Sequence, residues 1–235
     1  MKIVILGAGK VGSFVTSDLS NEGHDIVVID NDKAVLDDLL ATNDVMGLLG
    51  DGRDVDILIE AGAKDCDLFI AVTLSDDVNL IASTLAKKLG AKNIIIRLRE
   101  THYVKHKKMI AQMTDAKSII NPEYIAAKDI QRTLKYSHAL NVEGFFKDRA
   151  LMMELVIDEG SDLDGRKISD LISYSENYHT LIGIINSDGD VRIPHGDDIL
   201  KANDKIYVIG EKQAVDSFYR HEQKGAYDIK NVMVI

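Results

Sequence analysis

The chain has few of the residues that mark small secreted, fibrous or disordered proteins. Its 235 residues include one cysteine, two prolines and no tryptophan. A single cysteine excludes an internal disulfide framework and a cysteine-based zinc cluster, and it is typical of a reducing compartment. With 46% hydrophobic and 28% charged residues, the composition is that of a globular chain long enough for one or two domains.

Net positive charge and long apolar runs are also lacking. Lys and Arg total 28 against 38 Asp and Glu, which gives a formal net charge of −10. This balance disfavours general binding to nucleic acids or anionic lipids, because both are densely negative. No apolar stretch approaches the roughly 18 residues of a membrane span, and the first residues have no secretion-signal pattern. We therefore expect a cytoplasmic protein that reaches any membrane through a partner.

The first 140 residues alternate short apolar runs with helix-like segments. Apolar runs without polar alternation are typical of strands buried on both faces, as in a parallel sheet covered by helices. The pattern predicts an α/β domain with a Rossmann-like, doubly wound parallel sheet. Gly23 and Gly90 are expected to end the first and fourth helices, and a long helix begins at Pro122 and runs to about His138. The predicted strands cover residues 2–6, 25–29, 45–49, 68–72, 93–98 and 118–120.

A smaller α+β domain is predicted to follow. We place the first domain at residues 1–139 and the second at 140–225. Ser187–Asp190 has the composition of a hairpin turn. Residues 226–235 include a run that resembles the first strand. It is open to two interpretations, a short terminal edge strand or the start of a second copy of the whole unit, and we expect the second. The second domain's predicted elements are strands over 151–157, 180–186, 191–193 and 205–209 and a short helix over 168–172.

A glycine-rich loop follows the first predicted strand and opens a helix. Its sequence, Gly7-Ala8-Gly9-Lys10-Val11-Gly12, has the spacing G-x-G-x-x-G. In this pattern the first glycine permits a tight turn, the second lets a pyrophosphate approach the backbone, and the third lets helix and strand pack closely. The helix N-terminus adds free N–H groups and a partial positive charge. These six residues are predicted to bind the phosphates of a nucleotide.

Polar residues at the ends of the other strands complete the predicted site. Asp30 ends the second strand, where its carboxylate would accept hydrogen bonds from ribose hydroxyls and repel a 2′-phosphate, which favours NAD or an adenosine nucleotide over NADP. Arg97 and Arg99 follow the fifth strand, and each is open to two roles, a phosphate contact or a surface ion pair. Asp77 and Asn79 are expected to cap and solvate the fourth helix. The further candidate ligand contacts are Asp51, Thr73, Leu74, Arg97 and Arg99.

The residues that catalysis would require are not found. A dehydrogenase needs an acid or base beside the nicotinamide. Tyr124 and Lys128 have the Tyr-x-x-x-Lys spacing, but Tyr103 and Lys107 repeat it, and packing explains both pairs better. The histidines have no metal-site spacing, and Cys66 is expected to be a packed, unreactive thiol. We therefore predict a nucleotide that is bound but not turned over.

Several stretches together resemble one known family, the TrkA-like regulatory subunits of Trk/Ktr potassium uptake systems, which are built from RCK domains. The resemblance covers nearly the whole chain and includes both predicted domains. In the first domain it is carried by residues 1–12, by Gly50-Asp51-Gly52, by residues 67–73, by Asp76-Asp77-Val78-Asn79, by Arg97-Leu98-Arg99 with Tyr103, and by Asn121-Pro122-Glu123. In the second it is carried by residues 161–168, 193–197 and 203–210.

The resemblance implies a peripheral cytoplasmic subunit on the inner face of the plasma membrane. It would bind NAD, NADH, ATP or ADP, assemble with itself as a dimer or higher ring, and set the activity of an integral-membrane potassium-translocating subunit. Carried over by position, Gly7, Gly9, Lys10 and Val11 would contact phosphates, and Asp30 would contact the adenosine ribose. Thr73 would lie by the ligand, and Arg99 or else Arg97 would lie near phosphate. Glu123 stands where some relatives place a cation-linked acid.

Two other functions share the nucleotide-binding domain. An NAD-dependent oxidoreductase is the main alternative, and the missing acid–base constellation and the small second domain count against it. A redox-sensing DNA-binding repressor would need a basic recognition helix, and neither the overall charge nor any segment supplies one.

Overall fold

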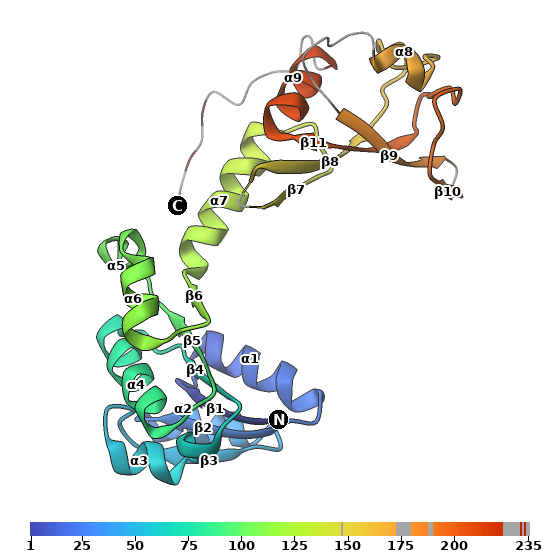
Figure 1. Ribbon diagram of the computed structural model, residues 1–235. Helices are drawn as coiled ribbons and strands as arrows, with labels where there is room; N and C mark the ends of the chain where they lie inside the picture. Colours follow the sequence, from blue (N-terminus) through green and yellow to red (C-terminus); the bar gives the residue numbers. More distant parts are fainter. Residues whose placement is uncertain (147, 173–179, 188–189, 223–230, 232, 234–235) are drawn as a thin grey trace. The chain divides into compact units, whose positions relative to one another are not determined.

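Alternating strands and helices build the N-terminal part of the chain into a parallel sheet with helices on both faces. The computed structural model describes residues 1–146, 148–172, 180–187, 190–222, 231 and 233. The chain divides into two units, Met1–Ala126 and Ala127–Ile235, each with its own core (Figure 1).

The first unit holds a six-stranded parallel sheet in the order β3-β2-β1-β4-β5-β6. β2 and β4 both pair with β1, so the strand order reverses there, and the carboxyl ends of β1 and β4 border the switch point at which such sheets bind ligands. The predicted Rossmann-like sheet is confirmed. Its strands are β1 (Lys2–Leu6), β2 (Asp25–Asp30), β3 (Met46–Leu49), β4 (Leu68–Ala71), β5 (Asn93–Arg97) and β6 (Ser118–Ile120).

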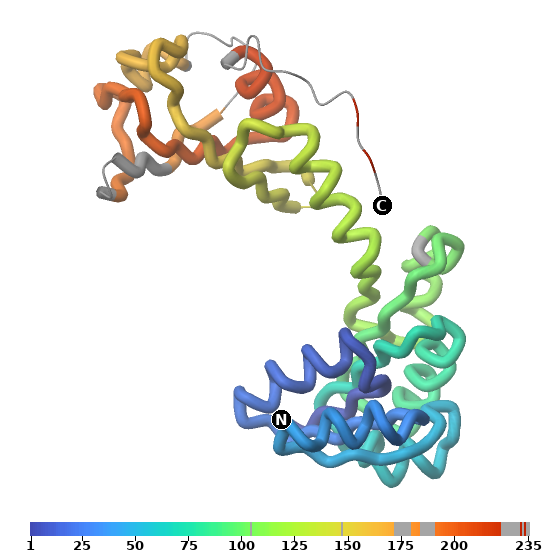
Figure 2. The backbone as a smooth tube through the Cα atoms, turned by 180° about the vertical axis from the view of Figure 1, so that it is seen from behind, coloured from blue at the N-terminus to red at the C-terminus, as the bar shows by residue number. Residues whose placement is uncertain are grey.

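Helices cover both faces of this sheet because successive strand residues point to opposite sides. Ile3 and Ile5 of β1 pack in one apolar cluster with α1 (Lys10–Asn21) and α2 (Lys33–Leu40). Val4 and Leu6 pack in another cluster with the helices of the opposite face (Figure 2). That second layer contains α3 (Val55–Glu60), the 3-10 turn η1 (Ala63–Asp65), α4 (Asp76–Leu89) and α6 (Lys107–Thr114), and the short α5 (Thr101–Lys105) leads into α6.

Glycines end two of these helices as predicted. Gly23 follows α1 with φ of 76°, and Gly90 ends α4 with φ of 127°. A side chain is strained in this part of φ/ψ space, which is why glycine stands at both positions.

The second unit contains an antiparallel sheet in the order β10-β9-β11-β8-β7. The predicted α+β character is confirmed, but two elements were not expected. β7 carries one half-buried residue among exposed ones, so it lacks the alternation that marks a strand, and α9 is a mostly polar segment. The elements are β7 (Asn141–Phe145), β8 (Ala150–Val156), α8 (Ile168–Ile172), β9 (Thr180–Ser187), β10 (Asp190–Arg192), β11 (Lys205–Glu211) and α9 (Lys212–Glu222).

The helix α7 (Pro122–Lys135) contributes its first turn to the first unit and the rest to the second. The division at Ala126 therefore falls inside a helix that the sequence analysis assigned whole to the first domain. The physical reason is Tyr136, which directly follows α7 and is buried in the core of the second unit. Its hydroxyl donates to Asp216 of α9, and the Lys135 ammonium lies 2.7 Å from the same carboxylate.

Two of the sequence predictions fall mainly on residues outside the described part of the chain. They concern the centre of the Ser187–Asp190 turn and, apart from Asn231 and Met233, the proposed second copy over 226–235. Both stay predictions.

The single cysteine gives a direct test of the packing in the first unit. The Cys66 side chain is fully buried, and burial raises the pKa of its thiol to about 11. Because the thiolate is the reactive form, about one thiol in a thousand is ionised at about pH 8. We expect the native protein to resist iodoacetamide while the urea-unfolded chain is labelled completely, as measured by mass spectrometry. Native labelling at the rate of a free thiol would contradict the buried position.

Candidate functional site

The glycine-rich loop lies where the ends of β1 and β4 approach each other. Gly7 donates its N–H to the carbonyl of Ile29 at 2.8 Å, and its φ of 107° turns the chain away from β1. A Cβ at Gly7 would lie 3.0 Å from the backbone nitrogen of Thr73, the second residue after β4. The loop and Thr73 are therefore in van der Waals contact at the switch point.

Asp30 fixes the loop from the end of β2. Its Oδ2 accepts a hydrogen bond from the Ala8 N–H at 2.6 Å, and its Oδ1 accepts one from the Asp32 N–H at 2.9 Å. The carboxylate is half-buried, and each of its oxygens keeps acceptor capacity beyond these two bonds. The structure thus places the predicted ribose-binding acid next to the predicted phosphate loop.

The N-terminus of α1 is left open beside this carboxylate. Gly9 is the N-cap residue, and no side chain in the described part of the chain caps it. The first N–H groups of a helix have no partner within the helix, so those of α1 are available to an anion. Ser13, which the sequence analysis did not single out, holds the loop from inside by donating its hydroxyl to the Ala8 carbonyl at 2.6 Å. A hydroxyl one turn into the helix is a weak sequence signal, because serine is common at helix starts.

Asn79 was expected to cap and solvate the fourth helix, and this prediction is wrong. Its side chain is fully buried, and its Oδ1 accepts hydrogen bonds from the Thr73 N–H at 3.0 Å and the Thr73 hydroxyl at 2.7 Å. Its amide donates to the carbonyls of Thr73 at 3.1 Å and Arg97 at 3.0 Å. Asn79 thus joins the residues that follow β4 to the end of β5.

The expected capping role of Asp77 is also wrong. Ser75 is the N-cap of α4, and its hydroxyl oxygen accepts the Val78 N–H at 3.3 Å. Asp77 instead accepts a hydrogen bond from the Tyr103 hydroxyl at 2.8 Å, and this bond raises the pKa of Tyr103. The neighbouring Asp76 is buried and accepts the N–H groups of Arg99 and Glu100. These carboxylates fix the loop after β5.

The two arginines at the end of β5 differ in environment. Arg97 is 6% exposed, and its guanidinium is paired with Glu123 of α7. Arg99 has an exposed side chain that makes no hydrogen bond or ion pair within the described residues. The charge of Arg99 helps to lower the pKa of the Glu123 carboxyl, but its exposed side chain can still turn to a phosphate, whereas Arg97 is held inside the protein. This is the order in which the resemblance ranked them.

The two remaining candidates lie at the same edge of the sheet. Asp51 follows β3 and is already paired with Arg53 at 2.6 Å, and the hydrogen bonds from Arg53 lower the pKa of Asp51 to about 2. Leu74 follows Thr73 and is 75% exposed. An apolar side chain this exposed beside the loop is suited to contact with a flat base. The structure thus brings residues 7–12, Asp30, Thr73 and Leu74 together and engages Asp51 and Arg97 elsewhere.

One residue of each Tyr-x-x-x-Lys pair is engaged by an acidic side chain. Tyr103 packs against the core and bonds Asp77. Tyr124 is exposed, contrary to the packing role expected for it. Lys128 pairs with Asp148, and both residues belong to the second unit. Among the described residues, no group of three or more His, Cys, Asp or Glu side chains could hold a metal ion. None of the described helices combines the length and apolar character that crossing a membrane requires.

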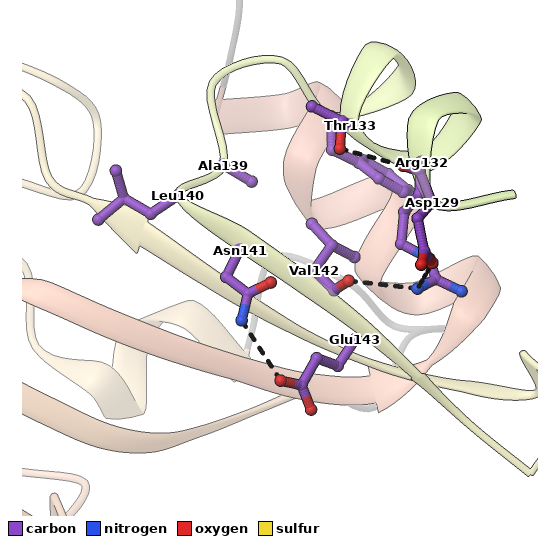
Figure 3. Close-up of a pocket in the computed structure, with 9 residues that line it drawn as sticks. Asp129, Arg132, Thr133, Ala139, Leu140, Asn141, Val142 and Glu143 are labelled. Carbon is purple, nitrogen blue, oxygen red and sulfur yellow. Dashed lines mark hydrogen bonds and ion pairs between the residues drawn. The ribbon is translucent and has the colours of Figure 1, made fainter. Parts of the chain in front are cut away.

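A cavity of about 360 Å³ lies in the second unit, between the last turns of α7 and β7 (Figure 3). The Arg132 guanidinium belongs to its lining. That group already donates to Asp148 at 2.8 Å and to the Val142 carbonyl at 3.4 Å. Because the chain itself holds this guanidinium, we assign no ligand to the cavity.

The sequence matches two family models. The model described as the TrkA-N domain matches residues 3–122, and the model described as the TrkA-C domain matches residues 152–222. The first match covers the sheet, the glycine-rich loop and the first residue of α7. The second covers most of the antiparallel sheet and α9.

Curated relatives are similar to this chain over most of its length. A Trk system potassium uptake protein TrkA homolog from Archaeoglobus fulgidus is 32% identical over 216 residues, which are 92% of this chain and 48% of the relative. One from Pyrococcus horikoshii is 29% identical over 228 residues, which are 95% of this chain and 98% of the relative. The chain thus spans about half the length of the first relative and nearly the full length of the second.

Solved structures have the same fold at low sequence identity. The GsuK RCK domain aligns with a TM-score of 0.60 and 15% identity, over 95% of this chain and 48% of that one. The GsuK channel bound to NAD aligns with a TM-score of 0.56 and 16% identity, over 96% of this chain and 40% of that one.

Two glycine substitutions separate ligand approach from folding. A Cβ at Gly9 would meet no atom within 4 Å, and its φ of −65° suits alanine. We expect Gly9→Ala to keep wild-type thermal stability and to lower the affinity for NADH and ATP about tenfold or more, because the methyl group occupies the space that phosphate needs. Gly12→Ala should lose stability as well, because its Cβ would lie 1.7 Å from the Gly7 carbonyl oxygen.

Calorimetric melting and equilibrium dialysis with the two nucleotides measure both effects. A Gly9→Ala variant with wild-type stability and unchanged affinity would contradict the assignment of phosphates to this loop.

Proposed function

The chain belongs to the family of proteins with TrkA-N and TrkA-C domains, and we propose that it is a nucleotide-binding regulatory subunit of a membrane potassium-uptake system. The observation that carries the proposal is the open N-terminus of α1 beside the Asp30 carboxylate. Relatives named as Trk system potassium uptake proteins support the potassium system as the partner. The ligands proposed are NAD or NADH, with ATP or ADP as competitors at the same cleft.

Asp30 accounts for the preference for a nucleotide whose ribose hydroxyls are free. Its two oxygens already hold the Ala8 and Asp32 N–H groups, which fixes the carboxylate at the end of β2. Ribose hydroxyls can still donate to the remaining lone pairs, whereas a 2′-phosphate would meet a fixed negative charge. The site therefore favours NADH over NADPH. The GsuK channel bound to NAD supports a dinucleotide in this fold.

Regulation rather than turnover is proposed because the residues around the loop serve to bind and position. Asp51, Asp76, Asp77 and Arg97 each hold another group of the protein, which leaves them engaged rather than poised as acids or bases. The oxidoreductase alternative needs a proton donor or acceptor beside the nicotinamide. No contact among the described residues favours an oxidoreductase.

The proposed mechanism is a population shift between assemblies. A nucleotide that binds one assembly tenfold more tightly than another contributes about 1.4 kcal/mol per site to their balance. α7 is the proposed arm between copies, because it buries none of its residues and exposes Tyr124, Ile125 and Ile130. The assembly would act from the cytoplasmic face on the integral-membrane subunit that translocates potassium.

Asp30→Ala tests the ligand assignment, with Asp25→Ala as its matched control. Asp25 is an exposed aspartate at the opposite end of the same strand. We expect Asp30→Ala to lower the affinity for NADH and ATP about tenfold or more and Asp25→Ala to leave it unchanged. Equilibrium dialysis measures affinity, and rubidium uptake by membranes that contain the translocating subunit measures regulation. Nucleotide-dependent uptake should disappear only with Asp30→Ala.

The preference for NADH over NADPH should narrow in Asp30→Asn, because the negative charge is gone. The amide has one acceptor oxygen for the two N–H groups of Ala8 and Asp32, so this variant also loses one of the two hydrogen bonds that hold the loop. Unchanged nucleotide affinity in Asp30→Ala would refute the ribose assignment. Intact nucleotide binding without any effect on uptake would refute the regulatory role.

A further inference from the structure

Asn79 joins two loops that approach the proposed ligand from different strands. Its four hydrogen bonds reach the backbone and hydroxyl of Thr73 after β4 and the carbonyl of Arg97 at the end of β5. A fully buried amide with all these partners fixes the distance between them, because breaking any bond leaves a buried polar group unpaired. Movement of Thr73 is therefore opposed unless Arg97 moves with it.

Arg97 is bound less completely than Asn79. The guanidinium is paired with Glu123, but the buried Nε has no hydrogen-bond partner in the described part of the chain. The Glu123 carboxylate is 52% exposed. The guanidinium of this buried residue thus has one ion pair among the described residues, with a half-exposed partner, so a displacement of Arg97 changes that pairing.

Glu123 lies in the first turn of α7, the helix that continues from the sheet of the first unit into the second unit (Figure 1). Burial raises the pKa of this carboxyl, but its own backbone N–H, the Arg97 guanidinium and the charge of Arg99 outweigh that effect and leave the pKa below its usual range. The carboxylate is charged at neutral pH, and its ion pair with Arg97 ties the start of α7 to β5.

We propose that Asn79 is a positioning residue that makes Thr73 and Arg97 move together, and that the Arg97–Glu123 ion pair passes this movement to the first turn of α7. The inference rests on the proposed nucleotide binding at the glycine-rich loop. It names the contacts by which occupancy of that loop reaches the helix proposed to join copies. Neither Asn79 nor Glu123 need touch the nucleotide.

Hydrogen-exchange mass spectrometry of the full chain, with saturating ATP or NADH as the probe, tests this route. In the wild type we expect nucleotide to slow exchange in the glycine-rich loop and to change exchange at residues 121–126. In Glu123→Gln we expect the affinity to stay within about threefold and the loop to be protected, while the change at residues 121–126 is lost. Glu123→Asp, which keeps the charge, should restore part of that change.

Glu100→Gln is the matched control. It removes the same charge from the same edge of the sheet, but the Glu100 carboxylate lies 3.9 Å from Nδ1 of His102 rather than against Arg97. This variant should respond as the wild type does. Asn79→Ala should behave as Glu123→Gln does: nucleotide still slows exchange in the loop but no longer changes exchange at residues 121–126. If Asn79→Ala does not fold, Glu123→Gln alone carries the test.

The outcomes distinguish this inference from the proposed function. Absence of nucleotide binding in the wild type would overturn both. If nucleotide protects the loop in every variant, nucleotide binding stands. The inference is then overturned if Glu123→Gln keeps the response at residues 121–126, or if Glu100→Gln loses it equally.

Discussion

The hydrogen bond from the Ala8 N–H to the Asp30 carboxylate is the contact on which the account depends. It joins the ends of β1 and β2 at the switch point, and Gly7 brings the same loop against Thr73 after β4. The ends of β1, β2 and β4 can meet there because residues 7 and 12 are glycines: a Cβ at Gly7 would crowd Thr73 and a Cβ at Gly12 would overlap the Gly7 carbonyl. The resulting edge presents free helix N–H groups next to a carboxylate, the groups that would bind the phosphates and the ribose of the proposed nucleotide.

The fold of the first unit could be predicted because each buried strand is a short apolar run between helices. The strand predictions at residues 2–6 and 118–120 coincide with β1 and β6. The second unit was harder. β7 has a single half-buried residue, and its place in the sheet is set by pairing with β8 rather than by its own pattern. The unit boundary inside α7 depends on the burial of Tyr136 beside Asp216, a contact between residues 80 positions apart.

The candidate site, like the fold, could be predicted from the sequence only in part. The glycine spacing and the acid at the end of β2 are local patterns, and the structure places both at one edge. Asn79 has no such pattern, because an asparagine in the first turn of a helix is usually a cap or a solvated residue. Its burial follows from the crossing of α4 over the ends of β4 and β5, which only the tertiary structure fixes. Arg97 likewise could be assigned to Glu123 only after β5 and α7 were placed.

Calorimetric titration of the purified chain with NAD, NADH, ADP and ATP, with the absorbance of NADH followed throughout, tests the central claim most directly. The account predicts saturable binding at one site per chain and no loss of NADH absorbance. Absence of binding heat with all four nucleotides, together with no retention in dialysis, would contradict nucleotide recognition at the glycine-rich loop. Sustained oxidation of NADH that depends on a small substrate would contradict the regulatory role in favour of an enzyme.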